Sequence, residues 1–152
     1  MGLKFRIRID AKPDDVFAYL SDVSRHGEWA NPAAQLQVKK VSDGPIGAGS
    51  QFRSEQKFAG KQHGADIAIR TFEPPRVLQI VANQSHGNKK PATFVHTFTL
   101  TPDGSGTIVE RDIDRENASP LAALGIVFYP AIKSDAMKGL KGLKARVESG
   151  KA

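Results

Sequence analysis

The feature that most constrains this chain is a change of hydrophobic pattern near residue 117. Before that point, short apolar segments are separated by clusters of Gly, Pro, Asn and Asp, which is typical of strands joined by turns. After it, apolar residues recur at helical spacing, at Ile132, Ala136, Leu140, Leu143 and Val147. The sequence therefore predicts a sheet followed by one long helix.

The first 32 residues add one strand and two short helices to this plan. Apolar and charged side chains alternate over residues 3–10, which predicts a strand with one solvent-facing side. Pro13 suits the first position of a helix, and a short amphipathic helix is expected over residues 13–22. A second helical turn is expected within residues 25–32.

Six further strands are expected, and their short links require antiparallel pairing. They are placed at residues 36–41, 51–58, 65–72, 77–82, 93–100 and 107–113. A twisted sheet of about seven strands cannot bury its apolar face alone, and only the C-terminal helix is long enough to cover it. The predicted fold class is α+β: a seven-stranded curved antiparallel sheet around a long C-terminal helix, with two short helices after strand 1.

The size and composition of the chain indicate one domain over residues 1–152, with 148–152 as a frayed tail. No run approaches the 20 or so apolar residues that a membrane span needs, and the N-terminus lacks a signal-peptide core. We therefore expect a cytoplasmic protein without stable membrane insertion, as a monomer or homodimer. The absence of cysteine excludes disulfides and thiolate chemistry.

The formal charge of +6 raises the question of nucleic acid, because clustered Lys and Arg neutralise phosphates. Here the cations are scattered, and the densest group lies on the C-terminal helix, where it is typical of a solvated face. No nucleic acid is expected as a partner. His26, His63 and His86 have no metal-binding spacing, and no phosphate-binding glycine loop is present. We expect neither a metal nor another cofactor.

Four segments carry a family resemblance: IDAKPDDVFAYLSDVSRHGEWANP (9–32), GPIGAGSQF (44–52), FEPPRVLQI (72–80) and TLTPDGSGTIVERDID (99–114). In this order and spacing they resemble the START-like helix-grip (SRPBCC) superfamily, and within it the polyketide cyclase/dehydrase branch. The resemblance spans nearly the whole chain. It implies a hollow domain that binds a lipid, polyketide or other apolar small molecule between sheet and helix. It does not imply one chemistry.

Two polar side chains are expected on the inward face of neighbouring strands. His96 shares a face with Phe94 and Phe98, and Arg111 shares one with Val109. His96 is either a neutral core histidine or a hydrogen-bond partner of a ligand. Arg111 is either solvated at a strand end or a buried cation that needs a carboxylate, a ligand anion or water beside it.

Trp29 and Arg70 are further candidates. Trp29 lies where the family often has an aromatic residue at the cavity mouth, but it can equally be a packing residue. The resemblance implies that Arg70 corresponds to a cavity arginine that polarises a substrate carbonyl. Periodicity instead predicts that Arg70 faces solvent unless a bulge shifts the register, because Ile67 and Ile69 occupy the inward face.

Three functions follow as hypotheses, of which a non-catalytic one is favoured. The first is binding or carriage of an apolar small molecule in an internal cavity. The expected ligand-binding residues are Trp29, Phe52, Phe94, His96, Phe98, Val109, Arg111 and Leu140. The alternative is a cyclase or dehydratase in which His96 is the general base and Arg111 or Arg70 stabilises an enolate oxygen. The third is association of the basic C-terminal helix with an acidic protein.

Overall fold

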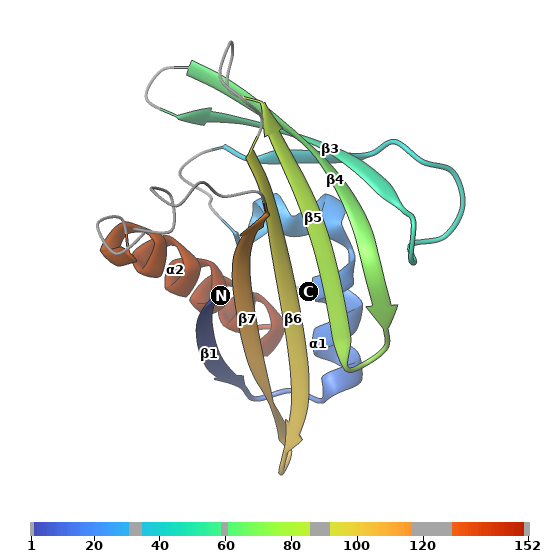
Figure 1. The fold of residues 1–152 in the computed structure, drawn as a ribbon. Coiled ribbons are helices and arrows are strands. Elements are labelled where there is room, and N and C mark those ends of the chain that lie inside the picture. Colours follow the sequence, from blue (N-terminus) through green and yellow to red (C-terminus); the bar gives the residue numbers. More distant parts are fainter. Residues whose placement is uncertain (1, 31–34, 59–60, 86–91, 117–128, 151–152) are drawn as a thin grey trace.

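The computed structural model describes residues 2–30, 35–58, 61–85, 92–116 and 129–150. The elements, in chain order, are β1 (Leu3–Ile9), α1 (Pro13–Ser21), the 3-10 helix η1 (Val23–Glu28), β2 (Gln37–Lys40), β3 (Gln51–Phe58), β4 (Lys61–Glu73), β5 (Val77–Ser85), β6 (Ala92–Asp103), β7 (Gly106–Glu116) and α2 (Tyr129–Glu148). Both α-helices lie on one side of a curved sheet, while the other side is open (Figure 1).

All seven strands form one sheet in the order β1-β7-β6-β5-β4-β3-β2, and every neighbouring pair is antiparallel. The first strand therefore joins the last, and the remaining strands follow as a meander. This arrangement confirms the predicted α+β fold class, with its curved antiparallel sheet, its C-terminal helix and its two short helices after the first strand.

The element bounds differ from the expected ones where polar sequence extends a strand. β3 covers the predicted residues 51–58, whereas β4 begins at Lys61, four residues before the predicted start. Pro130 lies in the first turn of α2, where the backbone N–H that proline lacks would have no partner within the helix. The apolar residues 122–128 that precede this helix lie outside the described residues.

The core lies between the sheet and the two α-helices. It includes fully buried side chains from every layer, among them Ile9, Leu20, Leu78, Val109 and Leu140. Val16 and Leu20 come from the apolar stripe of α1, and Leu140 and Leu143 from that of α2. The period-two faces of the strands and the stripes of the helices thus meet as the sequence pattern indicates.

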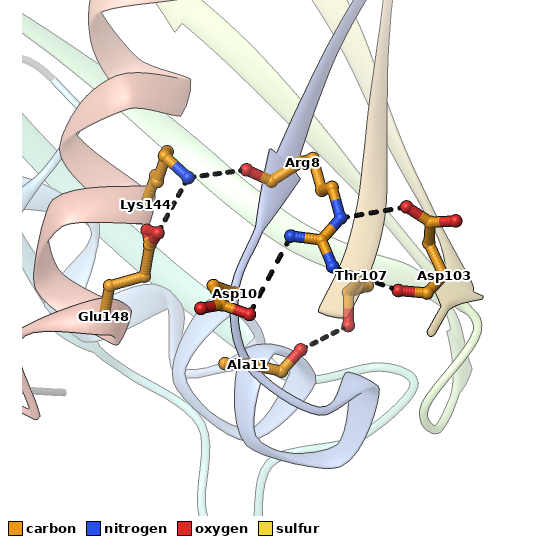
Figure 2. Close-up of polar contacts among 7 residues, drawn as sticks. All are labelled: Arg8, Asp10, Ala11, Asp103, Thr107, Lys144 and Glu148. Atoms are coloured by element: carbon orange, nitrogen blue, oxygen red, sulfur yellow. Dashed lines mark hydrogen bonds and ion pairs between the residues drawn. The ribbon is translucent and has the colours of Figure 1, made fainter. Parts of the chain in front are cut away.

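Polar contacts fix the corner where β1, β7 and α2 meet (Figure 2). Lys144 Nζ of α2 donates to the carbonyl of Arg8, at 2.9 Å, and forms an ion pair with Glu148. The guanidinium of Arg8 contacts Asp103 at 2.9 Å and Asp10 at 3.8 Å. These contacts link α2 to β1, and β1 to the end of β6.

Candidate functional site

The inner face of the sheet is filled unevenly. Toward one end, Leu78 and Leu100 reach the helices and are buried. Toward the other end, the facing side chains on β4 and β5 are small, namely Ala65 and Ala82. Because these alanines leave space, a cavity of about 140 Å³ remains between the sheet and the residues at the end of η1.

Apolar side chains form much of the cavity wall. Ile67, Ile80 and Phe98 line it from the sheet, and Trp29 lines it from the chain that follows η1. Trp29 is 1% exposed, and its ring lies edge-on to that of Phe98 with centroids 6.4 Å apart. The cavity therefore has an aromatic wall at its Phe98 side.

Arg111 and His96 supply the polar part of that same side. Arg111 stands opposite Phe98 in the β6/β7 register, and its guanidinium lies over the Phe98 ring, 5.4 Å from the centroid. Arg111 Nη2 donates to His96 Nδ1 at 3.1 Å. Both side chains line the cavity and are partly exposed there. The predicted inward faces of β6 and β7 thus bring these two residues into contact.

Arg111 is held in an apolar environment without a counterion. No carboxylate of the described residues lies within ion-pair distance of it, although ten ion pairs are formed elsewhere in this part of the chain. Burial lowers the pKa of Arg111 to about 10, so it still carries a positive charge at neutral pH. Its Nε is buried and has no hydrogen-bond partner among the described residues.

His96 is neutral, and its contact with Arg111 selects the tautomer. Burial is the main cause that lowers the pKa of His96 well below 6.5, and the positive charge of Arg111 lowers it further. A guanidinium has only donors, so His96 Nδ1 must accept. The proton of the neutral ring then resides on Nε2, which makes that atom a hydrogen-bond donor.

His26 is a second neutral histidine at this site. Its Nε2 donates to the Leu20 carbonyl at 2.7 Å, and burial lowers the pKa of His26 to about 4. Its ring lies 4.8 Å from that of Trp29, and both residues line the cavity. Trp29 Nε1 is buried without a partner among the described residues. The site therefore holds a cation and an unused indole N–H beside two uncharged imidazoles.

Two glycines of α2 allow the helix to approach this wall closely. A Cβ on Gly142 would lie 2.6 Å from the Trp29 carbonyl oxygen. A Cβ on Gly139 would lie 3.3 Å from Arg111 Nη1 and 3.7 Å from Trp29 Cζ3. The guanidinium and the indole are thus neighbours beneath the helix.

The remaining predicted ligand-binding residues do not line this cavity. Phe52, Val109 and Leu140 are at most 1% exposed within the packed core. Phe94 lies below the guanidinium of Arg115, 5.9 Å from the ring centroid. Of the eight candidates, Trp29, His96, Phe98 and Arg111 are brought together at the cavity.

Arg70 lies apart from the cavity. The β4/β5 register shifts between Ile69 and Thr71, so an irregularity is present at this residue. The Arg70 side chain is nevertheless 48% exposed and pairs with Glu116 at 3.0 Å. It is not among the residues that line the cavity.

Several polar cavity residues were not predicted from the sequence. They are His26, Ser54, Gln56, His63 and Gln84. Four of them lie on strands, where a polar residue within an alternating pattern normally indicates the solvent side. Only the paired strand register could have revealed them, because Ser54, Ala65 and Gln84 form one row across β3, β4 and β5.

The chemistry available here is recognition of a polar group at one end of a small, partly apolar space. Arg111 supplies a positive charge and N–H donors at the cavity wall. No group of three or more His, Asp or Glu side chains that could hold a metal ion occurs in the described part of the chain. Likewise, none of the helices described is both long and apolar enough to span a membrane.

Comparison with known proteins identifies the family. The family of polyketide cyclase/dehydrase and lipid transport proteins matches residues 3–148. No curated protein matches the chain significantly. Among solved structures, protein CV1439 from Chromobacterium violaceum is 16% identical, with a TM-score of 0.74 over 97% of this chain and 96% of that one.

Two further structures have the same fold. Ara h 8.0201 is 14% identical, with a TM-score of 0.71 and 98% of each chain covered. DynU16, a protein of the dynemicin biosynthetic locus, is 17% identical with a TM-score of 0.66, covering 98% of this chain and 48% of that one. These likenesses confirm the helix-grip architecture expected from the START-like resemblance. Since the family match extends over nearly the whole sequence, the chain belongs to the polyketide cyclase/dehydrase and lipid transport family.

Proposed function

We propose that this protein binds a small, largely apolar molecule in the cavity between its sheet and the η1 segment, as a binder or carrier. The observation that supports the proposal is the hollow part of the inner face, where Ala65 and Ala82 leave about 140 Å³ unfilled. Ligand sites are commonly concave and apolar, with a few polar groups that orient the ligand. The description of the family, which includes lipid transport, agrees with such a role.

The alternative, a cyclase or dehydratase acting in the same cavity, needs a base. The contact between Arg111 and His96 occupies Nδ1, the nitrogen that would take a proton from a substrate. The low pKa of His96 also weakens it as a base near neutral pH. This geometry favours His96 as a hydrogen-bond donor to a ligand over His96 as a catalytic base.

The test fills the cavity without touching its polar groups. Ala82→Leu adds volume to the wall between Ile67 and Phe94 in the paired strands. Binding of the neutral probe N-phenyl-1-naphthylamine is followed through its own fluorescence and through quenching of Trp29, the only tryptophan. We expect the wild type to bind the probe and Ala82→Leu to bind it at least about tenfold more weakly.

A matched control places the same leucine on the other face of the sheet. Ala68 follows Ile67 on β4 and therefore points away from the cavity. Ala68→Leu should bind the probe as the wild type does. If the wild type binds neither this probe nor other apolar compounds, the proposed function is wrong. Equal probe binding by both leucine variants would place the ligand elsewhere.

A further inference from the structure

Arg111 forms no ion pair with any Asp or Glu side chain of the described residues. All 16 Asp and Glu residues belong to the described part of the sequence. None of them forms an ion pair with Arg111, whose nearest polar partner in that part is the uncharged His96. A buried cation without an anion is unfavourable by several kcal/mol in a protein interior. Arg111 is therefore a largely buried positive charge to which the Asp and Glu side chains supply no counterion.

The unused donors beside Arg111 fit an anion as well. Arg111 Nε and Trp29 Nε1 are both buried and lack partners among the described residues. Arg111 Nη1 and Trp29 Cζ3 both lie within 4 Å of the Cβ position of Gly139, so the two side chains are neighbours below α2. Guanidinium groups bind carboxylates through paired, charge-assisted hydrogen bonds, and an indole N–H can only donate. A carboxylate in the cavity would supply the negative charge that the guanidinium lacks.

The rest of the cavity restricts what carries that oxygen. The wall beside Arg111 includes Phe98, Trp29 and Ile80, and the volume is only about 140 Å³. A long or multiply charged molecule does not suit a space of this size and lining. A compact apolar body with one acidic group does.

We propose that the cavity selects small monocarboxylates with an apolar body, whose carboxylate binds Arg111. This inference rests on the proposed function and specifies its ligand class. His96 accepts from Arg111 through Nδ1, and the Phe98 ring lies below the guanidinium, so both hold it in place. The Nε2–H of His96 can then donate to the ligand. No covalent step is involved.

Two probes of nearly equal shape separate the contribution of the carboxylate charge to binding from that of the apolar body. We would titrate the full chain at pH 7.5 with 2-naphthoate and with the neutral 2-naphthalenemethanol, using calorimetry and Trp29 fluorescence. The expected result is that the acid binds about tenfold or more tightly than the alcohol, as for a hydrogen-bonded charge. Equal or weaker binding of the acid overturns the inference.

Two variants then test whether Arg111 causes the preference for the acid over the alcohol. Arg111→Met keeps an apolar stem of similar length, and it should abolish the preference while the alcohol still binds. Arg6→Gln is the matched control, because Arg6 is an exposed strand arginine that faces away from the cavity and pairs with Glu110. It should leave the preference unchanged. A preference that survives Arg111→Met in a folded variant contradicts the assignment.

The possible outcomes separate the preference for an acid from the proposed function, which is binding of a small apolar molecule in the cavity. If the alcohol and acid bind equally, the cavity is a ligand site but not an acid-selective one. If neither probe nor N-phenyl-1-naphthylamine binds, the proposed function itself fails. The wild-type comparison of the two probes remains decisive even if Arg111→Met does not fold.

Discussion

Arginine side chains have opposite surroundings at two places in the molecule. One is the corner between β1, β7 and α2, and the other is the cavity beneath α2. At the corner, Arg8 lies at the surface and contacts two carboxylates, those of Asp103 and Asp10 (Figure 2). In the cavity, Arg111 is largely buried and has no carboxylate partner among the described residues. The exposed guanidinium of Arg8 is thus paired with carboxylates, whereas the largely buried guanidinium of Arg111 is not.

This difference in pairing separates charges that add to the stability of the fold from a charge that does not. Exposed ion pairs such as Arg8–Asp103 contribute roughly 0–1 kcal/mol each. A buried charge without a partner lowers stability instead. The interior of the cavity therefore reduces the stability of the unliganded protein, and the following changes test this contrast in order of expected effect.

Acidification should produce the largest effect, because it forces charge onto the buried histidines. The pKa of His26 is about 4 in the folded protein against 6.5 as its ordinary value. Between these pH values the unfolded chain binds more protons, so stability falls as the pH drops from about 6.5 to about 4. The loss from His26 alone is roughly 3 kcal/mol. Urea unfolding at several pH values measures it.

His26→Gln provides the control for this pH dependence. Glutamine can donate to the Leu20 carbonyl but does not titrate. The variant should lose less stability between pH 6.5 and 4 than the wild type does, while His96 still contributes in the same direction. An unchanged pH profile would show that His26 is not the group responsible.

Removal of the unpaired cation should raise stability. Arg111→Met replaces a buried charge by an apolar side chain, and we expect the unliganded protein to gain about 1–4 kcal/mol. Chemical denaturation at pH 7.5 measures the change. A loss of stability would mean that contacts of Arg111 with His96 and Phe98 outweigh the cost of burying it.

A methyl group at the contact between α2 and Trp29 should have a somewhat smaller, opposite effect. Gly142→Ala improves helix propensity, but its Cβ would lie 2.6 Å from the Trp29 carbonyl oxygen. We expect a loss of about 1–3 kcal/mol from overpacking. Gly47→Ala is the control, since nothing lies within 4 Å of its Cβ position. Equal stability of the two variants would contradict the close approach.

Loss of the surface pair should have the smallest effect. Arg8→Gln removes the ion pairs with Asp103 and Asp10 at positions that are largely solvated. The free energy of unfolding should fall by less than about 1 kcal/mol, and less still at high salt. A loss larger than that of Gly142→Ala would invert the ranking of corner and cavity.

The fold was largely predictable because its patterns are local. The two-residue period identified the inward face of β6, and turn residues placed β3 over the observed range. The extension of β4 to Lys61 was missed, since its first residues carry no apolar alternation. Strand pairing alone makes that polar segment a strand.

The cavity was predictable only in part, because it depends on contacts between distant segments. The predicted inward face of β7 led to Arg111, but its lack of a carboxylate needed the positions of every acidic residue. His26 lies in a short helix whose sequence gives no sign that it packs against Trp29. In the sequence, a histidine in an exposed polar turn has the same kind of neighbours as a histidine that lines a cavity, and only the folded structure separates the two cases.

The direct contact of α2 with the Trp29 backbone limits how ligand size can change in related proteins. Because a Cβ at Gly142 would lie 2.6 Å from the carbonyl oxygen of Trp29, α2 leaves little space for an outward shift of this segment. Among the described residues, additional room can come from the sheet, where β4 and β5 carry Ala65 and Ala82. Divergence in ligand size should therefore be concentrated in the side chains of the sheet, while the helical glycines stay small.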